Sequence, residues 1–245
     1  RGDRMKTLVA MDTKSVVGKS LVEERTGQPC ENFRNGDHTT TLIRTENGKV
    51  IEIQHDVMTP QPYNRLYQLT GTKGFANKYP IEGYALDAKQ LNASGVVPEV
   101  DNLNSHSFMP KKDMEALVQK YQHPILKKYG EMAKEVGGHG GMDFIMDSRL
   151  VYCLQNGLPL DMDVYDLAEW CCLAELGELS MDNNCAAVAF PDFTRGEWNK
   201  GKGHKHAYAS PEDESVAMEK AKKITAKLKE KGAVEWAGEA VENKK

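Results

Sequence analysis

Residues 39–56, TTTLIRTENGKVIEIQHD, contain two runs of strand-forming residues on either side of Asn47-Gly48. Asn-Gly supplies the positive φ angles that a tight hairpin turn requires, and β-branched residues such as Ile51 favour a pleated surface. The stretch therefore predicts a β-hairpin. With a further strand expected over residues 65–70, the first 90 residues are predicted to be mainly β.

Further along the chain the pattern changes to helical periodicity. Residues 89–109 are expected to form a long loop, and residues 186–190 a late strand. Apolar spacing and stop signals predict helices over residues 110–121, 124–136, 142–155, 163–176 and 211–231. In the third helix Ile145, Leu150, Val151 and Leu154 are expected to point inward. In the fourth, Asp163 is expected to be the N-cap, and the buried face to consist of Leu167, Trp170, Cys171, Ala174 and Leu176.

The order of strands followed by helices, with no internal repeat and no sharp change of composition, predicts one α+β domain. Its sheet is expected to be open, mainly antiparallel and covered by helices on one face. The length of 245 residues and the hydrophobic content of 40% are ample for a buried core.

Charge and cysteine usage argue against several classes of protein. The net charge of −4 gives no surplus of basic residues for binding nucleic acid. The sequence also has no run of 18 apolar residues, the length that a membrane-spanning helix needs. The five cysteines include no CxxC pair, and the adjacent Cys171 and Cys172 point about 100° apart on a helix, so no metal site is expected. His204 and His206 are flanked by lysines, which favours a solvated loop.

The chain has no complete nucleotide-binding motif. Gly18-Lys19-Ser20 resembles the end of a phosphate-binding loop, but Thr13 stands where the first glycine is required. No G-x-G-x-x-G sequence follows a strand, so the chain by itself is not expected to bind a dinucleotide.

Two stretches are candidates for a binding site, and each also has a purely structural interpretation. Glycine-rich residues 136–143 place His139 and Asp143 at the start of a helix, where backbone N–H groups could meet a ligand. Alternatively, Asp143 caps the helix and His139 is hydrogen-bonded locally. Residues 59–65 place Tyr63 after two prolines, where its ring could cover a sugar or simply pack under an interrupted edge strand. The neighbours His55 and Asp56 are interpreted as separate residues, because adjacent strand residues face opposite sides.

Five segments in this order resemble the C-terminal part of the family 109 glycoside hydrolases, within the glucose-fructose oxidoreductase superfamily. They are RGDRM, the hairpin TTTLIRTENGKVIEIQHD, the segment TPQPYNRLYQLTGTKGFANKYP, GGHGGMDFIM and NGLPLDMDVYDLAEW. They span most of the chain.

The resemblance implies that residues 1–245 are a C-terminal substrate and oligomerisation domain. An N-terminal Rossmann domain that binds NAD would lie upstream of Arg1, together with the catalytic Tyr and His motif, and the fragment alone would be inactive. The implied activity is hydrolysis of α-N-acetylgalactosaminides. The sugar C3 hydroxyl is oxidised, the C2 proton becomes acidic, the aglycone is eliminated, water adds and the ketone is reduced again.

The same resemblance implies site residues in this chain. Tyr63 matches a substrate-binding tyrosine in a Pro-Tyr-x-Arg segment that also contains Arg65, and Tyr67 is the reserve candidate. Gln61 departs from the arginine expected there, which leaves the substrate contacts open. His139 and Asp143 match a Gly-His-Gly-Gly-x-Asp motif and are expected to shape the cleft.

The implied partners are a carbohydrate with terminal N-acetylgalactosamine and further copies of the protein, which would associate through the open sheet face. Two alternatives stay open: an NAD-dependent sugar oxidoreductase of the same superfamily, and a non-catalytic module for carbohydrate binding or dimerisation. The chain starts without Met, which indicates a fragment or processed chain. Export to the periplasm or cell envelope would depend on a signal upstream, so the compartment stays open.

Overall fold

The computed structural model of the chain describes residues 2–87, 89, 106–155, 160–200, 223 and 226. Contacts divide the chain into two compact units. The first combines Arg1–Thr59 with Met132–Lys245, and the second is Pro60–Glu131. No change of composition along the chain indicated this division. Most of the expected loop over residues 89–109, most of the expected helix over residues 211–231 and both His204 and His206 lie outside the described residues.

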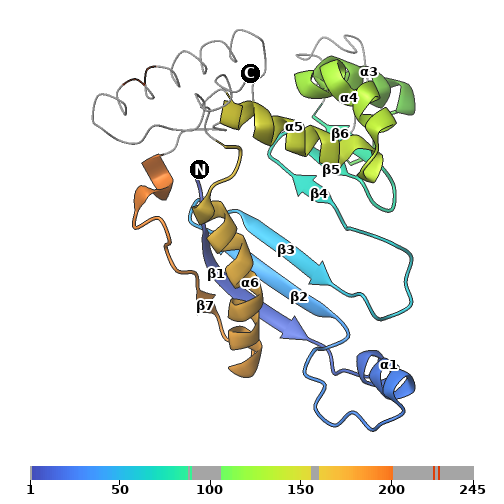
Figure 1. Ribbon diagram of the computed structural model, residues 1–245, viewed down its shortest axis with the longest axis vertical. Coiled ribbons are helices and arrows are strands. Elements are labelled where there is room, and N and C mark those ends of the chain that lie inside the picture. Colours follow the sequence, from blue (N-terminus) through green and yellow to red (C-terminus); the bar gives the residue numbers. More distant parts are fainter. Residues whose placement is uncertain are drawn as a thin grey trace, which may run out of the picture. The chain divides into compact units, whose positions relative to one another are not determined.

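The first unit contains an antiparallel sheet (Figure 1), whose strand order is β3-β2-β1-β7. The strands are β1 (Met5–Asp12), β2 (Thr39–Thr45), β3 (Val50–His55) and β7 (Val188–Ala189). The predicted hairpin is therefore confirmed as β2 and β3, and the predicted late strand as the shorter β7. Its turn differs in detail, because Gly48 has a positive φ of 78° whereas Asn47 does not. The Gly48 N–H bonds to Thr45 O, and Thr45 N–H bonds to Lys49 O, which gives a longer turn than a two-residue loop.

Helix α6 (Val164–Asp182) covers one face of this sheet (Figure 1). The Asp163 cap is confirmed: its side chain accepts from the backbone of Tyr165 and Asp166, and Asp166 bonds back to the Asp163 N–H to complete a capping box. The core consists of Leu8, Ala10, Ile43 and Phe190, against which Met5, Cys172, Leu173, Leu176 and Met181 pack.

The face of α6 that packs on the sheet is not the one predicted. Leu176 is on the packed side, but Leu167 is 58% exposed and Trp170 51% exposed, and Cys171 and Ala174 are exposed as well. Because α6 is apolar on nearly all sides, its periodicity could not identify the covered side. In α5 (Met142–Gln155), Cys153 is buried whereas Leu150, Val151 and Leu154 are exposed, so the inward face predicted there is also wrong.

Helix α1 (Val17–Thr26) was not predicted, although the first 90 residues are otherwise mainly β as expected. Its N-terminal N–H groups, those of Val16, Val17 and Gly18, each donate to the Asp37 carboxylate at 2.8 Å. This cap comes from a residue 19 to 21 positions away, so no local start signal marked the helix.

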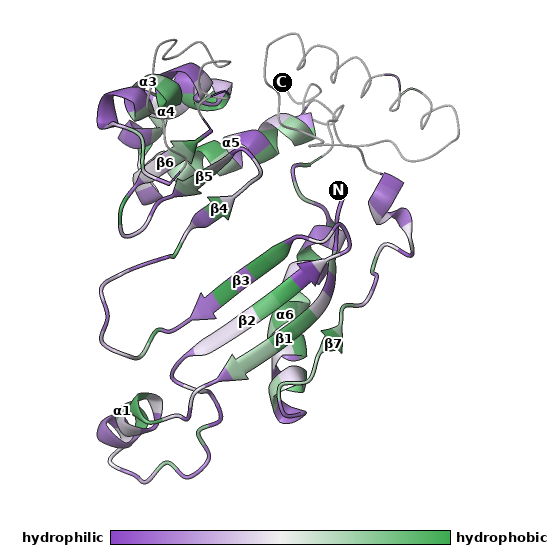
Figure 2. Cartoon of the chain, turned by 180° about the vertical axis from the view of Figure 1, so that it is seen from behind, coloured by the Kyte–Doolittle hydropathy of each residue, from purple (hydrophilic) through white to green (hydrophobic). Residues whose placement is uncertain are grey.

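The opposite face of the sheet carries no helix among the described residues (Figure 2). The strand register places Leu42 beside Val9 and Val50 beside Arg44 on this face. Leu42 is 47% exposed and Val50 69% exposed. The predicted architecture, an α+β fold with an open antiparallel sheet covered on one face, is confirmed.

The second unit contains a small antiparallel sheet of order β4-β5-β6. Its elements are β4 (Gln68–Thr70), β5 (Gly74–Asn77), β6 (Gly83–Leu86) and α3 (Lys111–Tyr121), and the unit ends within α4 (Pro124–Val136). Both helices agree with prediction. The strand expected over residues 65–70 begins only at Gln68, because Leu66 has a positive φ of 43° that breaks the extended backbone.

Candidate functional site

Four side chains of the second unit form an exposed cluster, here called the tyrosine platform: Tyr63, Arg65, Lys78 and Tyr79. Tyr63 is 71% exposed, and its ring meets that of Tyr79 edge-on, with centroids 6.1 Å apart and planes at 83°. The Arg65 guanidinium carbon lies 5.6 Å from the Tyr63 centroid, and Nε donates to the Tyr63 hydroxyl. Lys78 Nζ lies 5.8 Å from the Tyr79 centroid.

The backbone holds this platform through a short irregular segment. Asn64 Oδ1 accepts from the N–H of Leu66 at 2.7 Å and so stabilises the positive φ of Leu66. The N–H of Lys78 then donates to the carbonyl of Tyr67 at 3.0 Å, which ties the segment to the end of β5. Tyr67 thus contributes its backbone, and its side chain is 61% exposed.

The chemistry of the platform suits a hydroxylated ring. An exposed tyrosine offers an apolar face to the C–H side of a pyranose and a hydroxyl that can donate or accept. The guanidinium adds fixed N–H donors. The structure therefore brings together Tyr63 and Arg65, two of the residues predicted for substrate binding. Lys78 and Tyr79 were not predicted, because only the strand pairing brings them to Tyr63.

The glycine-rich turn belongs to the first unit. Gly137, Gly138, His139, Gly140 and Gly141 all have positive φ, from 47° at His139 to 96° at Gly141. His139 Nδ1 lies 2.8 Å from Asp143 Oδ2, and the two side chains are 73% and 41% exposed. The structure thus pairs the two predicted residues with each other in an exposed position. This pairing agrees with a local hydrogen bond for His139, and the expected role in shaping a cleft stays a prediction.

A second histidine–carboxylate pair, between His38 and Asp56, was not predicted. His38 Nδ1 lies 3.3 Å from Asp56 Oδ2, and Nε2 lies 3.1 Å from the hydroxyl of Thr40. The pKa of Asp56 is lowered, chiefly by hydrogen bonds from the Thr59 hydroxyl and backbone. The register that pairs Thr39 with His55 brings the flanking residues 38 and 56 together, so correct strand pairing would have revealed this contact. Asp56 holds the turn that leads into residue 60.

The residues around Gly18 do not fit a dinucleotide. The amides that would face a pyrophosphate at the start of α1 already bind the Asp37 carboxylate. A carboxylate there would also repel a phosphate. A Cβ on Gly18 would lie 2.6 Å from Met58 Sδ, so packing, rather than approach of a ligand, accounts for this glycine.

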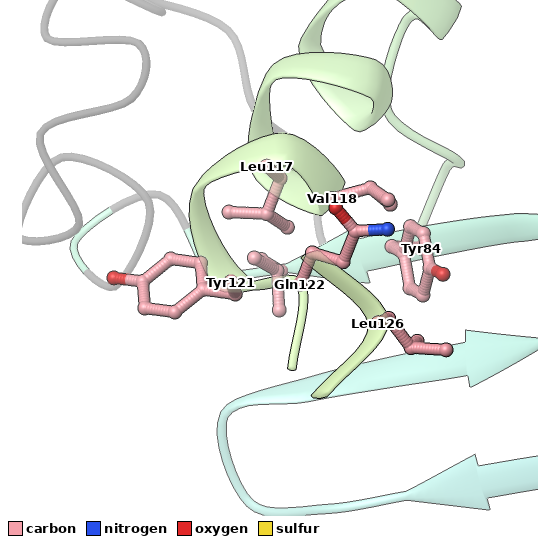
Figure 3. A pocket seen from close by; sticks show the side chains of 7 residues that line it. Tyr84, Leu117, Val118, Tyr121, Gln122 and Leu126 are labelled. Carbon is pink, nitrogen blue, oxygen red and sulfur yellow. The ribbon is translucent and has the colours of Figure 1, made fainter. Parts of the chain in front are cut away.

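A separate pocket of about 520 Å3 lies between β6, α3 and the start of α4 (Figure 3). Its lining consists of Tyr84, Leu86, Leu117, Val118, Tyr121, Gln122 and Leu126. The lining is mostly apolar, which suits a hydrophobic group better than a sugar. None of the predicted site residues lines it.

The described residues contain neither a candidate metal site nor a candidate membrane span. No group of three or more His, Cys, Asp or Glu side chains in that part of the chain is arranged to hold a metal ion. Likewise, none of its helices combines the length and the apolar character that a membrane span needs.

Comparison with known proteins identifies the family. The family described as "Glycosyl hydrolase 109, C-terminal domain" matches residues 1–200. Glycosyl hydrolase family 109 protein 5 of Phocaeicola vulgatus is 83% identical over 245 residues, which is 100% of this chain and 47% of the relative. Protein 4 of the same organism is also 83% identical, over 98% of this chain and 46% of its own length.

More distant relatives give the same result. Glycosyl hydrolase family 109 protein 1 of Bacteroides thetaiotaomicron is 60% identical over 209 residues, 85% of this chain and 44% of the relative. The chain thus spans about half the length of the curated relatives it matches. Because the family model covers residues 1–200 and the identities are this high, the chain belongs to glycosyl hydrolase family 109 and contains its C-terminal domain.

Proposed function

We propose that this chain is the substrate-binding half of an NAD-dependent glycosidase that hydrolyses α-N-acetylgalactosaminides by transient oxidation at C3, elimination, water addition and re-reduction. The observation that carries the proposal is the tyrosine platform, in a chain of family 109. Tyr63 would stack on the sugar ring, and Arg65 would orient the Tyr63 hydroxyl and bind sugar oxygens. His139 and Asp143, in the first unit, stay separate candidates for substrate binding.

We propose that NAD is held by the half of the longer relatives that this chain does not span, because the amides of the strand–loop–helix formed by β1 and α1 are already bound by Asp37. Bound there, the nicotinamide would accept and return a hydride at the sugar. The role left to this chain is to bind and orient the sugar.

The exposed side of α6 supports the proposal that this chain is one half of a larger protein. Val164, Leu167, Trp170 and Cys171 are exposed there, and an exposed group of large apolar side chains is typical of a surface that another part of a protein covers. The Met5 N–H donates to the α6 residue Glu169, so the first residues of the chain lie against the same helix. We propose that the rest of the protein packs on this side of α6, and that copies associate through the open sheet face.

The full-length protein provides the test. It should release N-acetylgalactosamine from 4-nitrophenyl α-N-acetylgalactosaminide, with no accumulation of NADH at 340 nm. Tyr63→Phe removes one hydrogen-bonding group and should lower kcat/KM about three- to tenfold. Tyr63→Ala also removes the ring and should cost more. Tyr121→Phe, an exposed tyrosine of α3 outside the platform, is the matched control and should change kcat/KM less than about twofold.

The alternatives give different results. Formation of NADH in stoichiometric amounts together with a keto sugar would show that the protein is a sugar oxidoreductase and not a glycosidase. Sugar binding with neither product would leave a non-catalytic carbohydrate-binding module. If Tyr63→Ala is as active as the wild type, the tyrosine platform does not bind the substrate.

A further inference from the structure

We infer that the tyrosine platform binds a carbohydrate carrying an anionic substituent, a sulfate or a carboxylate, next to the ring that stacks on Tyr63. The inference rests on the proposed sugar-binding function of the same residues. It adds a substrate class, since a neutral amino sugar needs no cation beside it.

The first observation is that the two cations of the platform have no acidic partner. Among the residues that the structure describes, no carboxylate lies within 4.0 Å of Arg65 or Lys78. Some other cations of the chain do have such a partner: Arg4 pairs with Glu46, Lys49 with Asp3 and Arg149 with Asp161. Within the described part of the chain, the platform therefore carries two positive charges that form no ion pair with a side chain.

The second observation is the charge of the surrounding sequence. Residues 57–81 contain Arg65, Lys73 and Lys78 and no Asp or Glu, although the chain as a whole has a net charge of −4. Like-charged groups concentrated in one region raise the local concentration of ligands of opposite charge. The segment that forms the platform is thus positively charged over residues 57–81, and the next acidic residue along the chain is Glu82.

The third observation is that the cations are held against the rings. Arg65 uses one of its five N–H donors on the Tyr63 hydroxyl, which leaves donors for a sulfate or carboxylate. Lys78 follows β5, its N–H is tied to the Tyr67 carbonyl at 3.0 Å, and its ammonium lies by Tyr79. The edge-on contact between Tyr63 and Tyr79 joins the two halves of the platform. A ring on Tyr63 would thus have cations beside it.

Direct binding tests the inference. Isothermal titration of the full-length protein would compare methyl α-N-acetylgalactosaminide with its 6-O-sulfate and its sialyl α2,6 derivative. At low salt we expect at least one charged ligand to bind about three- to tenfold more tightly than the neutral one, and the preference to shrink in 0.3 M NaCl, where exposed charges are screened to about 6 Å. The charged ligand that is preferred identifies sulfate or carboxylate as the group recognised.

Lys78→Gln should abolish most of this preference. Lys73→Gln is the matched control for the loss of one positive charge, since Lys73 precedes β5 and is not part of the platform, and it should keep most of the preference. Equal affinity for charged and neutral ligands, or equal effects of the two variants, would overturn the inference. If the neutral glycoside is still bound and hydrolysed in that case, the proposed function stands. Failure to bind any of the three ligands would contradict both this inference and the proposed function.

Discussion

Asp37 is the residue whose position explains most about the first unit. Its carboxylate accepts three backbone N–H groups at the start of α1, and these bonds lower its pKa, those of Gly18 and Val17 most. The carboxylates of Asp56 and Asp192 also have lowered pKa values, through hydrogen bonds led by the side chains of Thr59 and Thr194. All three residues favour the folded state in their charged form.

The sign of the pH dependence follows from these shifts. A folded-state pKa below the ordinary value of 3.8 contributes stability that is complete above that value and is lost as the pH falls through the lowered pKa. We expect the urea midpoint of unfolding to fall as the pH drops from about 5 to about 3. Asp37→Asn should lower the midpoint at neutral pH and make the decline shallower. Asp182→Asn, on an exposed side chain, is the control. An unchanged slope in Asp37→Asn would contradict the assignment.

The sequence identified individual candidate residues of the site but not the contacts between them. The prolines and Tyr63 were visible in the sequence, as were His139 and Asp143. That Arg65 bonds to Tyr63, and that Tyr79 supports the ring, depends on the turn at Leu66 and on the pairing of β4 with β5. No spacing rule for a strand or helix describes such a turn.

Among the elements, helices with local start and stop signals were predicted well. Helices α3 and α4 begin at Lys111 and Pro124, within one residue of prediction, and Asp163 caps α6. Helix α1 was missed because its cap, Asp37, lies beyond the helix in the sequence.

The capping box of α6 gives a prediction at this scale. Asp163→Ala removes the acceptor for the N–H groups of Tyr165 and Asp166 and should destabilise the protein by about 1 kcal/mol. Glu178→Ala, on an exposed position of the same helix, should change stability by less than about 0.5 kcal/mol. Urea unfolding followed by circular dichroism measures both. If the two variants lose equal stability, the capping box does not stabilise α6.

For the whole molecule, the uncovered side of α6 predicts how the chain differs from the longer protein. Cys171 is exposed, whereas burial raises the pKa of the thiols of Cys153 and Cys172 and so lowers their reactivity. In the 245-residue chain, maleimide should therefore modify Cys171 faster than either of these thiols.

In the full-length protein the same thiol should react at least about tenfold more slowly, because the rest of the protein would cover it. Tandem mass spectrometry of timed digests distinguishes Cys171 from Cys172. Cys30, which lies after α1 rather than on α6, is the control for a general change of reactivity. Equal labelling of Cys171 in both proteins would mean that the other half packs elsewhere.

The sequence by itself determined the hairpin, most helices and the family, because turn chemistry, caps and short motifs act over a few neighbouring residues. Only the tertiary structure decided which side of α6 meets the sheet, how Asp37 starts α1 and how Tyr63 comes to lie by Tyr79. Each of these contacts joins groups that are distant in sequence. Local patterns cannot show which side of an apolar helix is buried, because tertiary packing decides it.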